Sequence, residues 1–172
     1  MKLFYEKTFN LRHPVHDDLD EIMKLEEKCF PKEHRETAKT YEGRIKDFPE
    51  GALLLSCNNK IIGNIFGEIW KKDNFSFNLN HRTSDFLNKK GNILYISSFV
   101  ITARYRKHFL GVFLLKEYLE YMKKSFPAVS ECKLLVYRGW TRALNLYLKS
   151  GFSVEDKYEK YIIMNKKFKP AA

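Results

Sequence analysis

The sequence has 172 residues and a formal net charge of +10, and 44% of its residues are hydrophobic, with 14 Phe and 10 Tyr among them. Disordered chains are poor in such residues, so we expect one packed domain over residues 1–172. No apolar run approaches the roughly 20 residues of a membrane span, and MKLFYEKTFNLRH lacks the features of a secretory signal. A cytoplasmic protein without membrane association is therefore expected.

The cysteines and the charge restrict the kind of site. Cys29, Cys57 and Cys132 are odd in number and lack metal-ligand spacing, so neither a disulfide framework nor a metal site is predicted. The positive charge favours an anionic ligand, but it does not choose between a nucleotide cofactor, a nucleic acid and an acidic surface. A lysine-rich solvated surface explains much of it equally well.

The first third of the chain predicts a strand, two helices and a hairpin. A helix that Asp17 or Asp18 caps is expected to end at Cys29 and to expose Glu26 with its other charged residues. Two strands flank Asn58-Asn59-Lys60 as in a tight hairpin. The predicted ranges are strand 9–12, helices 17–29 and 37–46, and strands 52–57 and 61–70.

The centre of the chain predicts a strand, a basic turn and a helix. Asn92 to Ile101 suits a strand buried on both faces, and apolar residues step by three and four from Leu110 onward. The first amides of a helix lack internal partners, so this turn is a natural anion site. The segment 71–91 before it is long enough to be a functional loop that covers a site.

The last part of the chain predicts a strand, a helix and a strand pair. Thr141 is expected to cap the helix, and Gly151 is expected to end it in a left-handed conformation. The element order predicts an α/β fold, with a mixed sheet and helices on both faces. The predicted ranges are strand 132–137, helix 141–150, and strands 152–155 and 161–164.

Two motifs carry a resemblance to a known family. The stretch FVITARYRKHFLGVFLL is similar to the family's strand, Q/R-x-x-G-x-G/A and helix, with Arg106 first and Gly111 last. ALNLYLKSGF matches the later A-x-x-x-Y-x-K-x-G-F. With these motifs, the chain resembles the GNAT superfamily of acyl-CoA-dependent N-acyltransferases. Segments such as EEKCFP and GEIW are similar to the arylalkylamine (serotonin-type) group within it.

The resemblance implies the GNAT fold, with a central, mostly antiparallel sheet, and transfer of acetyl from acetyl-CoA to a primary amine by direct attack. Tyr147 matches the tyrosine that protonates the CoA thiolate. Phe109 replaces a glycine of the family's cofactor loop. The residues that the resemblance assigns to the cofactor are Phe99, Val100, Ile101, Arg106, Lys107, His108, Phe109, Leu110 and Gly111.

The base that deprotonates the amine is not assigned by the resemblance. Tyr95 and Ser97 occupy the positions of two histidines of the arylalkylamine group, and they are candidates for a relay. Glu68 is a candidate that acts through water, although a solvated carboxylate at the sheet edge is the simpler interpretation. Two further groups are candidates to bind the acceptor: Glu26, Glu27 and Glu33 through charge, and Trp70, Phe75 and Phe77 through aromatic contact.

Three hypotheses of function remain. The first is an N-acetyltransferase that acts, as a monomer or homodimer, on a small amine, aromatic or not, or on an amine of a protein or peptide. The second is a catalytically weak CoA-binding module, for which Phe109 and the missing histidines argue. The third is a basic nucleic-acid-binding domain; it lacks a motif, so no nucleic-acid partner is expected.

Overall fold

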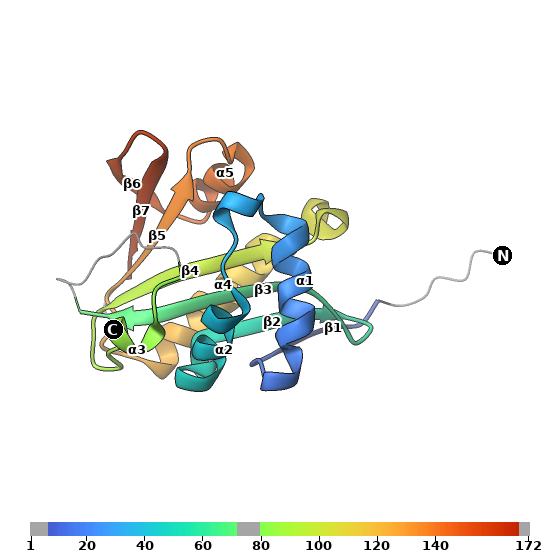
Figure 1. The fold of residues 1–172 in the computed structure, drawn as a ribbon. Helices are drawn as coiled ribbons and strands as arrows, with labels where there is room; N and C mark the ends of the chain where they lie inside the picture. Colours follow the sequence, from blue (N-terminus) through green and yellow to red (C-terminus); the bar gives the residue numbers. More distant parts are fainter. Residues whose placement is uncertain (1–6, 72–79, 169–172) are drawn as a thin grey trace.

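The described chain forms a seven-stranded mixed sheet in the order β1-β2-β3-β4-β5-β7-β6, in which only β4 and β5 run parallel (Figure 1). The computed structural model describes residues 7–71 and 80–168, with all their side chains except those of Lys107 and His108. The strands are β1 Phe9–Arg12, β2 Ala52–Cys57, β3 Lys60–Trp70, β4 Ile93–Ile101, β5 Glu131–Tyr137, β6 Ser153–Lys157 and β7 Tyr161–Lys167. The helices are α1 Leu19–Cys29, α2 Ala38–Asp47, α3 Thr83–Phe86, α4 Leu110–Ser125 and α5 Thr141–Lys149, with 3-10 turns η1 His16–Asp18, η2 Lys32–His34, η3 Pro49–Gly51 and η4 Ala103–His108.

Each face of the sheet carries its own apolar core. On one face, Ile22 of α1 and Tyr41 of α2 pack with Phe66 of β3. On the other, Leu114 and Met122 of α4 belong to the larger cluster, which also holds strand residues. Figure 1 shows α1 and α2 in front of the sheet and α4 behind it. The predicted α/β class, with helices on both faces of a mostly antiparallel sheet, is confirmed.

Short-range patterns fixed the ends of several elements. Asn58 and Asn59 both have positive φ, as a tight hairpin requires, and Gly151 ends α5 with φ of 86°. Of the two predicted N-caps, Asp18 is confirmed in position, although its side chain makes no cap hydrogen bond, and Thr141 is wrong. Asp18 holds the N-cap position of α1 but turns its carboxylate to Arg12, 2.6 Å away, and to the amide of Val15. Thr141 is the first residue of α5 itself, because the chain turns already at Trp140.

A bulge in β4 and the end of its pairing with β5 together open the site. Phe66 pairs with Ser98 and Gly67 with Ile96, so Ser97 is an extra residue in β4. The parallel pairing of β4 with β5 ends at Ile96, although β4 continues for five more residues. Figure 1 shows the two strands diverging. The β5-facing edge of residues 97–101 therefore has no strand partner in the described sheet.

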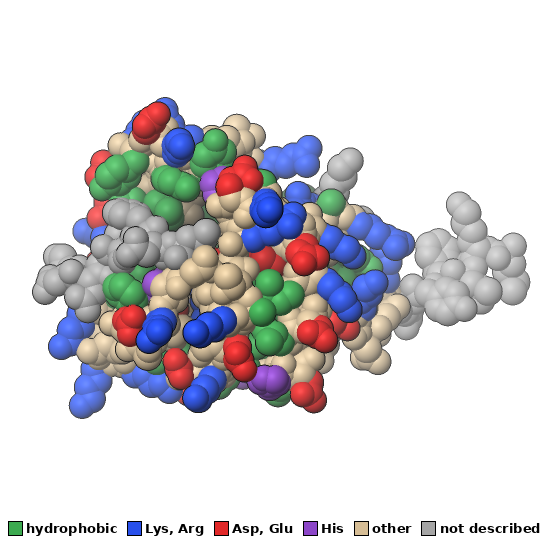
Figure 2. Space-filling model, in the orientation of Figure 1, with side chains coloured by type: hydrophobic (Ala, Val, Ile, Leu, Met, Phe, Trp, Pro, Cys, Tyr) green, Lys and Arg blue, Asp and Glu red, His purple; other side chains and the backbone are tan. Residues whose placement is uncertain are grey.

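Charged side chains of both signs are interspersed over the face that α1 and α2 cover, as Figure 2 shows. This distribution supports the interpretation that most of the positive charge is solvated surface charge. None of the helices in the described ranges is both long and apolar enough to cross a membrane.

Candidate active site

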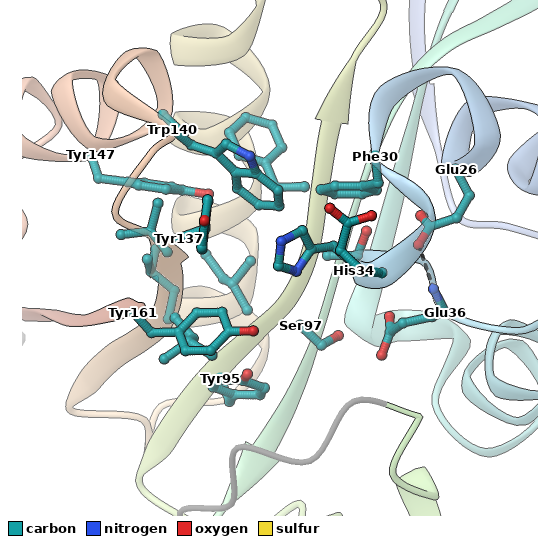
Figure 3. A pocket seen from close by; sticks show the side chains of 18 of the residues that line it. Glu26, Phe30, His34, Glu36, Tyr95, Ser97, Tyr137, Trp140, Tyr147 and Tyr161 are labelled. Carbon is teal, nitrogen blue, oxygen red and sulfur yellow. Dashed lines mark hydrogen bonds between the residues drawn. The ribbon is translucent and has the colours of Figure 1, made fainter. Parts of the chain in front are cut away.

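An aromatic cavity of about 170 Å³ opens where β4 and β5 diverge (Figure 3). Its walls come from segments far apart in the chain: the end of α1 and the following turn, the middle of β4, the end of β5, α5 and β7. The polar and aromatic residues that we use below are Glu26, Phe30, Glu33, His34, Glu36, His81, Tyr95, Ser97, Ser98, Tyr137, Trp140, Tyr147 and Tyr161.

A second hollow, the basic groove, has a volume of about 760 Å³ and runs between the end of β4, the start of α4 and α5. Arg106, Arg142 and Lys149 give it positive charge, and the first turn of the 16-residue helix α4 adds free amides at one wall. It is therefore suited to a large anionic ligand with an extended apolar arm.

The cavity and the groove meet at Tyr147. This side chain lines both, together with Phe30, Phe99, Trp140 and Ala143. Tyr147 is 7% exposed, and its ring contacts those of Phe99 and Phe152. Burial raises the pKa of its phenol, so the hydroxyl keeps its proton at neutral pH. A protonated donor thus stands at the junction of the two compartments.

Most of the residues predicted to hold a cofactor line the basic groove. Phe99, Val100, Ile101, Arg106, Phe109 and Gly111 do so, and Leu110 packs against the core instead. The side chains of Lys107 and His108 lie outside the description. The guanidinium of Arg106 donates from Nε to the carbonyl of Ile101 at 2.8 Å, which anchors the basic turn to the end of β4.

Phe109 has a left-handed backbone conformation, which glycine adopts without strain. Its φ is 57° and its ψ is 6°, in the left-handed region, and its side chain is 82% exposed. A non-glycine residue there is strained by about 1–2 kcal/mol. The ring of Phe109 is therefore solvent-exposed at the wall of the basic groove.

The predicted relay residues are only partly brought together. Tyr95 and Ser97 both line the aromatic cavity, but the bulge breaks the alternation of side chains along β4. Ser98, which sequence reasoning missed, shares with Tyr95 the face toward α1 and α2, since Ser98 pairs with Phe66 and Tyr95 pairs with Glu68. Burial raises the pKa of Tyr95, whose ring stacks on Trp70 at 4.2 Å. Phe75 and Phe77 lie outside the described residues.

Glu68 is buried behind the cavity rather than solvated at an edge. It is 0% exposed on the interior strand β3, so the interpretation as a solvated edge residue is wrong. Its carboxylate accepts hydrogen bonds from Trp70 and His81 at 2.9 Å and from Thr83 at 3.0 Å. Burial raises its pKa, but the interactions with His81, Arg44 and Trp70 together outweigh burial and lower it. Glu68 lines neither compartment.

Glu26 was expected on the exposed side of its helix, and this expectation is wrong. It is 1% exposed, and its carboxylate lies toward the aromatic cavity, as Figure 3 shows. The signal was present in the sequence, because residues 22, 25, 26 and 29 are spaced as one helix face. Of the other acidic candidates, Glu33 is exposed at the cavity wall and Glu27 lines neither compartment.

An aromatic cluster bridges the opening between the diverging strands. The ring of His34 lies 4.9 Å from Tyr137, 5.2 Å from Trp140 and 6.2 Å from Tyr161, and Phe30 lies 5.4 Å from Trp140. Figure 3 shows His34 directed from the α1–α2 turn toward Tyr137. No local pattern predicted this cluster, because its members come from irregular segments and three separate elements.

A mixed sheet with a bulged central strand, a basic groove at a helix start and an adjoining cavity defines the class of acyl-CoA-dependent transferases. Residues 19–152 match the model of the Acetyltransferase (GNAT) family. The chain belongs to this family. Its assignment to the arylalkylamine group remains a prediction.

One curated relative is similar to the chain over part of its length. The chain is 28% identical over 131 residues to YkwB, an uncharacterized N-acetyltransferase of Bacillus subtilis (strain 168). The match covers 66% of this chain and 55% of YkwB, so the chain spans about half the length of that relative.

Solved structures share the fold at low sequence identity. The loading GNATL domain of CurA from Lyngbya majuscula superposes with a TM-score of 0.83 at 17% identity, over 93% of this chain and 98% of that one. Arabidopsis thaliana Naa50, in complex with the bisubstrate analogue CoA-Ac-MVNAL, superposes with a TM-score of 0.70 at 22% identity, over 93% and 99%.

Proposed function

We propose that this protein is an acetyl-CoA-dependent N-acetyltransferase that acts on a small primary amine carrying an aromatic or other apolar group. The observation that supports this function most directly is the meeting of the basic groove and the aromatic cavity at Tyr147. A transferase for two substrates needs two compartments that share one point of reaction.

The basic groove fits acetyl-CoA by charge and shape. The β5-facing edge of residues 99–101 has no strand partner in the described sheet and offers backbone groups to an extended amide-containing arm, although the Ile101 carbonyl already accepts from Arg106. The loop from Arg106 to Gly111 and the start of α4 offer amides and positive charge to a pyrophosphate. A Cβ at Gly111 would lie 2.9 Å from Leu146 Cδ1, so this wall of the groove has little room for a side chain.

The aromatic cavity fits a small amine. Tyr137, Trp140, Tyr161 and His34 present rings that can pack on an apolar group and attract a cation. Glu33 adds negative charge at the wall, which favours a protonated amine over a neutral or acidic acceptor. A single amino-terminal residue of a peptide has similar chemistry, and Naa50 carries a peptide in its bisubstrate complex. The experiment below therefore includes peptides.

Direct attack of the amine is favoured by the positions of the cysteines. Cys57 and Cys132 are buried and line neither compartment, and Cys29 lines the groove with a pKa that burial raises. A thiol with a raised pKa is a poor acyl acceptor at neutral pH. In our mechanism the amine attacks the thioester carbonyl, the C–S bond breaks, and Tyr147 donates its proton to the leaving thiolate.

The test is release of the free CoA thiol from acetyl-CoA with a panel of 2-phenylethylamine, an aliphatic diamine, a lysine peptide and a peptide with a free amino terminus. We expect release with at least one amine, a drop of about 100-fold in kcat for Tyr147→Phe, and unchanged CoA affinity. Tyr158→Phe, at an exposed tyrosine outside both compartments, is the matched control. No release with any amine, despite CoA binding, would favour the CoA-binding module instead.

A further inference from the structure

A buried hydrogen-bonded chain joins α1, α2 and β4 beside the aromatic cavity. The hydroxyl of Tyr41 lies 2.6 Å from Glu26 Oε2 and 2.9 Å from Ser98 Oγ. Tyr41 is 0% exposed and Ser98 is 5% exposed. Since a phenol has one proton, Tyr41 donates to the carboxylate and accepts from Ser98. The three side chains thus form a continuous path for a proton.

The two ends of this path reach the cavity. Both Ser98 and Glu26 line it, whereas Tyr41 lies behind them. The bulge at Ser97 is the reason that Ser98 faces this side, because an unbroken alternation would have turned Ser98 away from Tyr95. The acceptor amine and the start of the path therefore share one small space.

The surroundings of Glu26 compensate its charge only in part. The described residues give its carboxylate two hydrogen bonds, from Tyr41 and from the amide of Glu36 at 2.8 Å. Burial raises the pKa of Glu26, and the hydrogen bonds and the charge of Arg44 of α2 only partly oppose it. The guanidinium of Arg44 is held by both oxygens of Glu36. The ionisable groups that face Glu26 are Tyr41, Glu36 and Arg44, with Cys29 on its own helix.

We propose that Glu26 is the terminal proton acceptor for the incoming amine, reached through Ser98 and Tyr41. The ammonium group gives a proton to Ser98 Oγ, the Ser98 proton passes to Tyr41, and the Tyr41 proton passes to Glu26 Oε2. The nitrogen is then neutral and free to attack, and Glu26 is a neutral acid. This inference rests on the proposed acetyltransferase function and names its missing base.

The protonation equilibrium of the amine shows how much a base is needed. An alkylamine with a pKa of about 10.4 is neutral only about once in 2,500 molecules at pH 7, which corresponds to about 4.6 kcal/mol. A carboxylate with an ordinary pKa is a weak base for this purpose, and one whose pKa burial raises is a better match. His34 also lines the cavity and is the rival base that the experiment must separate.

The experiment measures kcat/KM against pH for the wild type, Glu26→Gln, Ser98→Ala and His34→Gln, with the best amine of the panel and a fluorinated, less basic analogue of it. Glu27→Gln, at the exposed neighbouring carboxylate on the same helix, is the matched control. Acetyl-CoA affinity is measured for every variant to show that each is folded.

We expect Glu26→Gln to lower kcat/KM for the basic amine by about 100-fold or more and to abolish the acidic limb of the pH profile. Ser98→Ala should lower kcat/KM for the basic amine by a smaller factor than Glu26→Gln does. Glu27→Gln should behave as the wild type. With the weakly basic analogue, the defect of Glu26→Gln should shrink toward the wild-type rate, because that amine needs no base. If Glu26 had only a structural role, Glu26→Gln would lower kcat/KM for both amines by the same factor.

Two results would overturn the proposal. One is an acidic limb that persists in Glu26→Gln and disappears in His34→Gln, which would assign the base to His34. The other is an equal loss for both amines in Glu26→Gln. A wild type that is inactive with every amine would instead count against the proposed function itself, so the two failures are distinguishable.

Discussion

Glu26 and Glu68 are the same chemical group buried on the same side of the sheet, and their surroundings give them opposite properties. Glu68 accepts hydrogen bonds from Trp70, His81 and Thr83, and its pKa is lowered. Glu26 faces a cavity, with two hydrogen bonds and no ion pair among the described residues, and its pKa is raised. The number of donors and the nearby charge, rather than burial, separate a structural carboxylate from a candidate base.

Arg44 lies between the two carboxylates, and its removal is the largest expected perturbation. It is 2% exposed, forms a bidentate pair with Glu36, and has its Nε 3.7 Å from Glu68. Arg44→Met should lower the free energy of unfolding by about 3–5 kcal/mol, because two buried carboxylates lose their cation. Urea denaturation measures this. Arg12→Met, in the more exposed pair with Asp18, is the control and should cost about 1 kcal/mol or less.

Replacing Glu68 tests the other half of the comparison. Glu68→Gln should lower stability by about 3 kcal/mol, because His81 loses its charged partner, and the melting temperature should fall by about 6–12 °C. Turnover by the folded protein at a lower temperature should be retained, since Glu68 lines neither compartment. If Glu68→Gln lost most of its kcat without losing stability, Glu68 would again be a candidate base.

The two carboxylates should contribute to stability with opposite dependence on pH. The lowered pKa of Glu68 means that its contribution is present above about pH 4.3 and is lost as the pH falls through the folded pKa. The raised pKa of Glu26 means that the wild type loses stability as the pH rises from about 4.3 through the folded pKa. Denaturation of the wild type, Glu26→Gln and Glu68→Gln between pH 3 and 8 measures both. If both substitutions changed the pH dependence of stability in the same direction, the comparison of the two carboxylates would be contradicted.

A single hydrogen bond to Glu68 gives the smallest expected effect. Thr83 is 3% exposed and donates to Glu68 Oε1. Thr83→Val keeps the shape and removes the donor, so stability should fall by about 1.5 kcal/mol with kcat unchanged. Ser84→Ala, at the neighbouring exposed hydroxyl, should change stability by less than about 0.5 kcal/mol. Equal effects of both variants would mean that the bond to Glu68 contributes nothing.

The residues that the sequence singled out account for more of the basic groove than of the aromatic cavity, and their roles stay predictions. The basic turn, the start of α4 at Leu110 and the position of Tyr147 each depend on neighbours within a few residues, and the structure places Arg106, Gly111 and Tyr147 along the groove. The aromatic cavity depends on contacts between distant segments. Residues 30–34, 137–140 and 161 have no common local pattern, so their aromatic cluster was not foreseen.

The sequence by itself determined most of the element order, the hairpin at Asn58 and Asn59 and the stop at Gly151, because helix and strand periods and turn chemistry act over short distances. The family followed from the resemblance of two motifs, and α3 was not predicted. Only the tertiary structure decided which side chains share a face or a charge environment. Because of the bulge at Ser97, Ser98 rather than Ser97 lies next to Tyr41. The packing of α1 and α2 on the sheet places Glu26 at the wall of the cavity and surrounds Glu68 with hydrogen-bond donors. Such differences arise from long-range packing, where one added residue in a strand reverses every side chain beyond it.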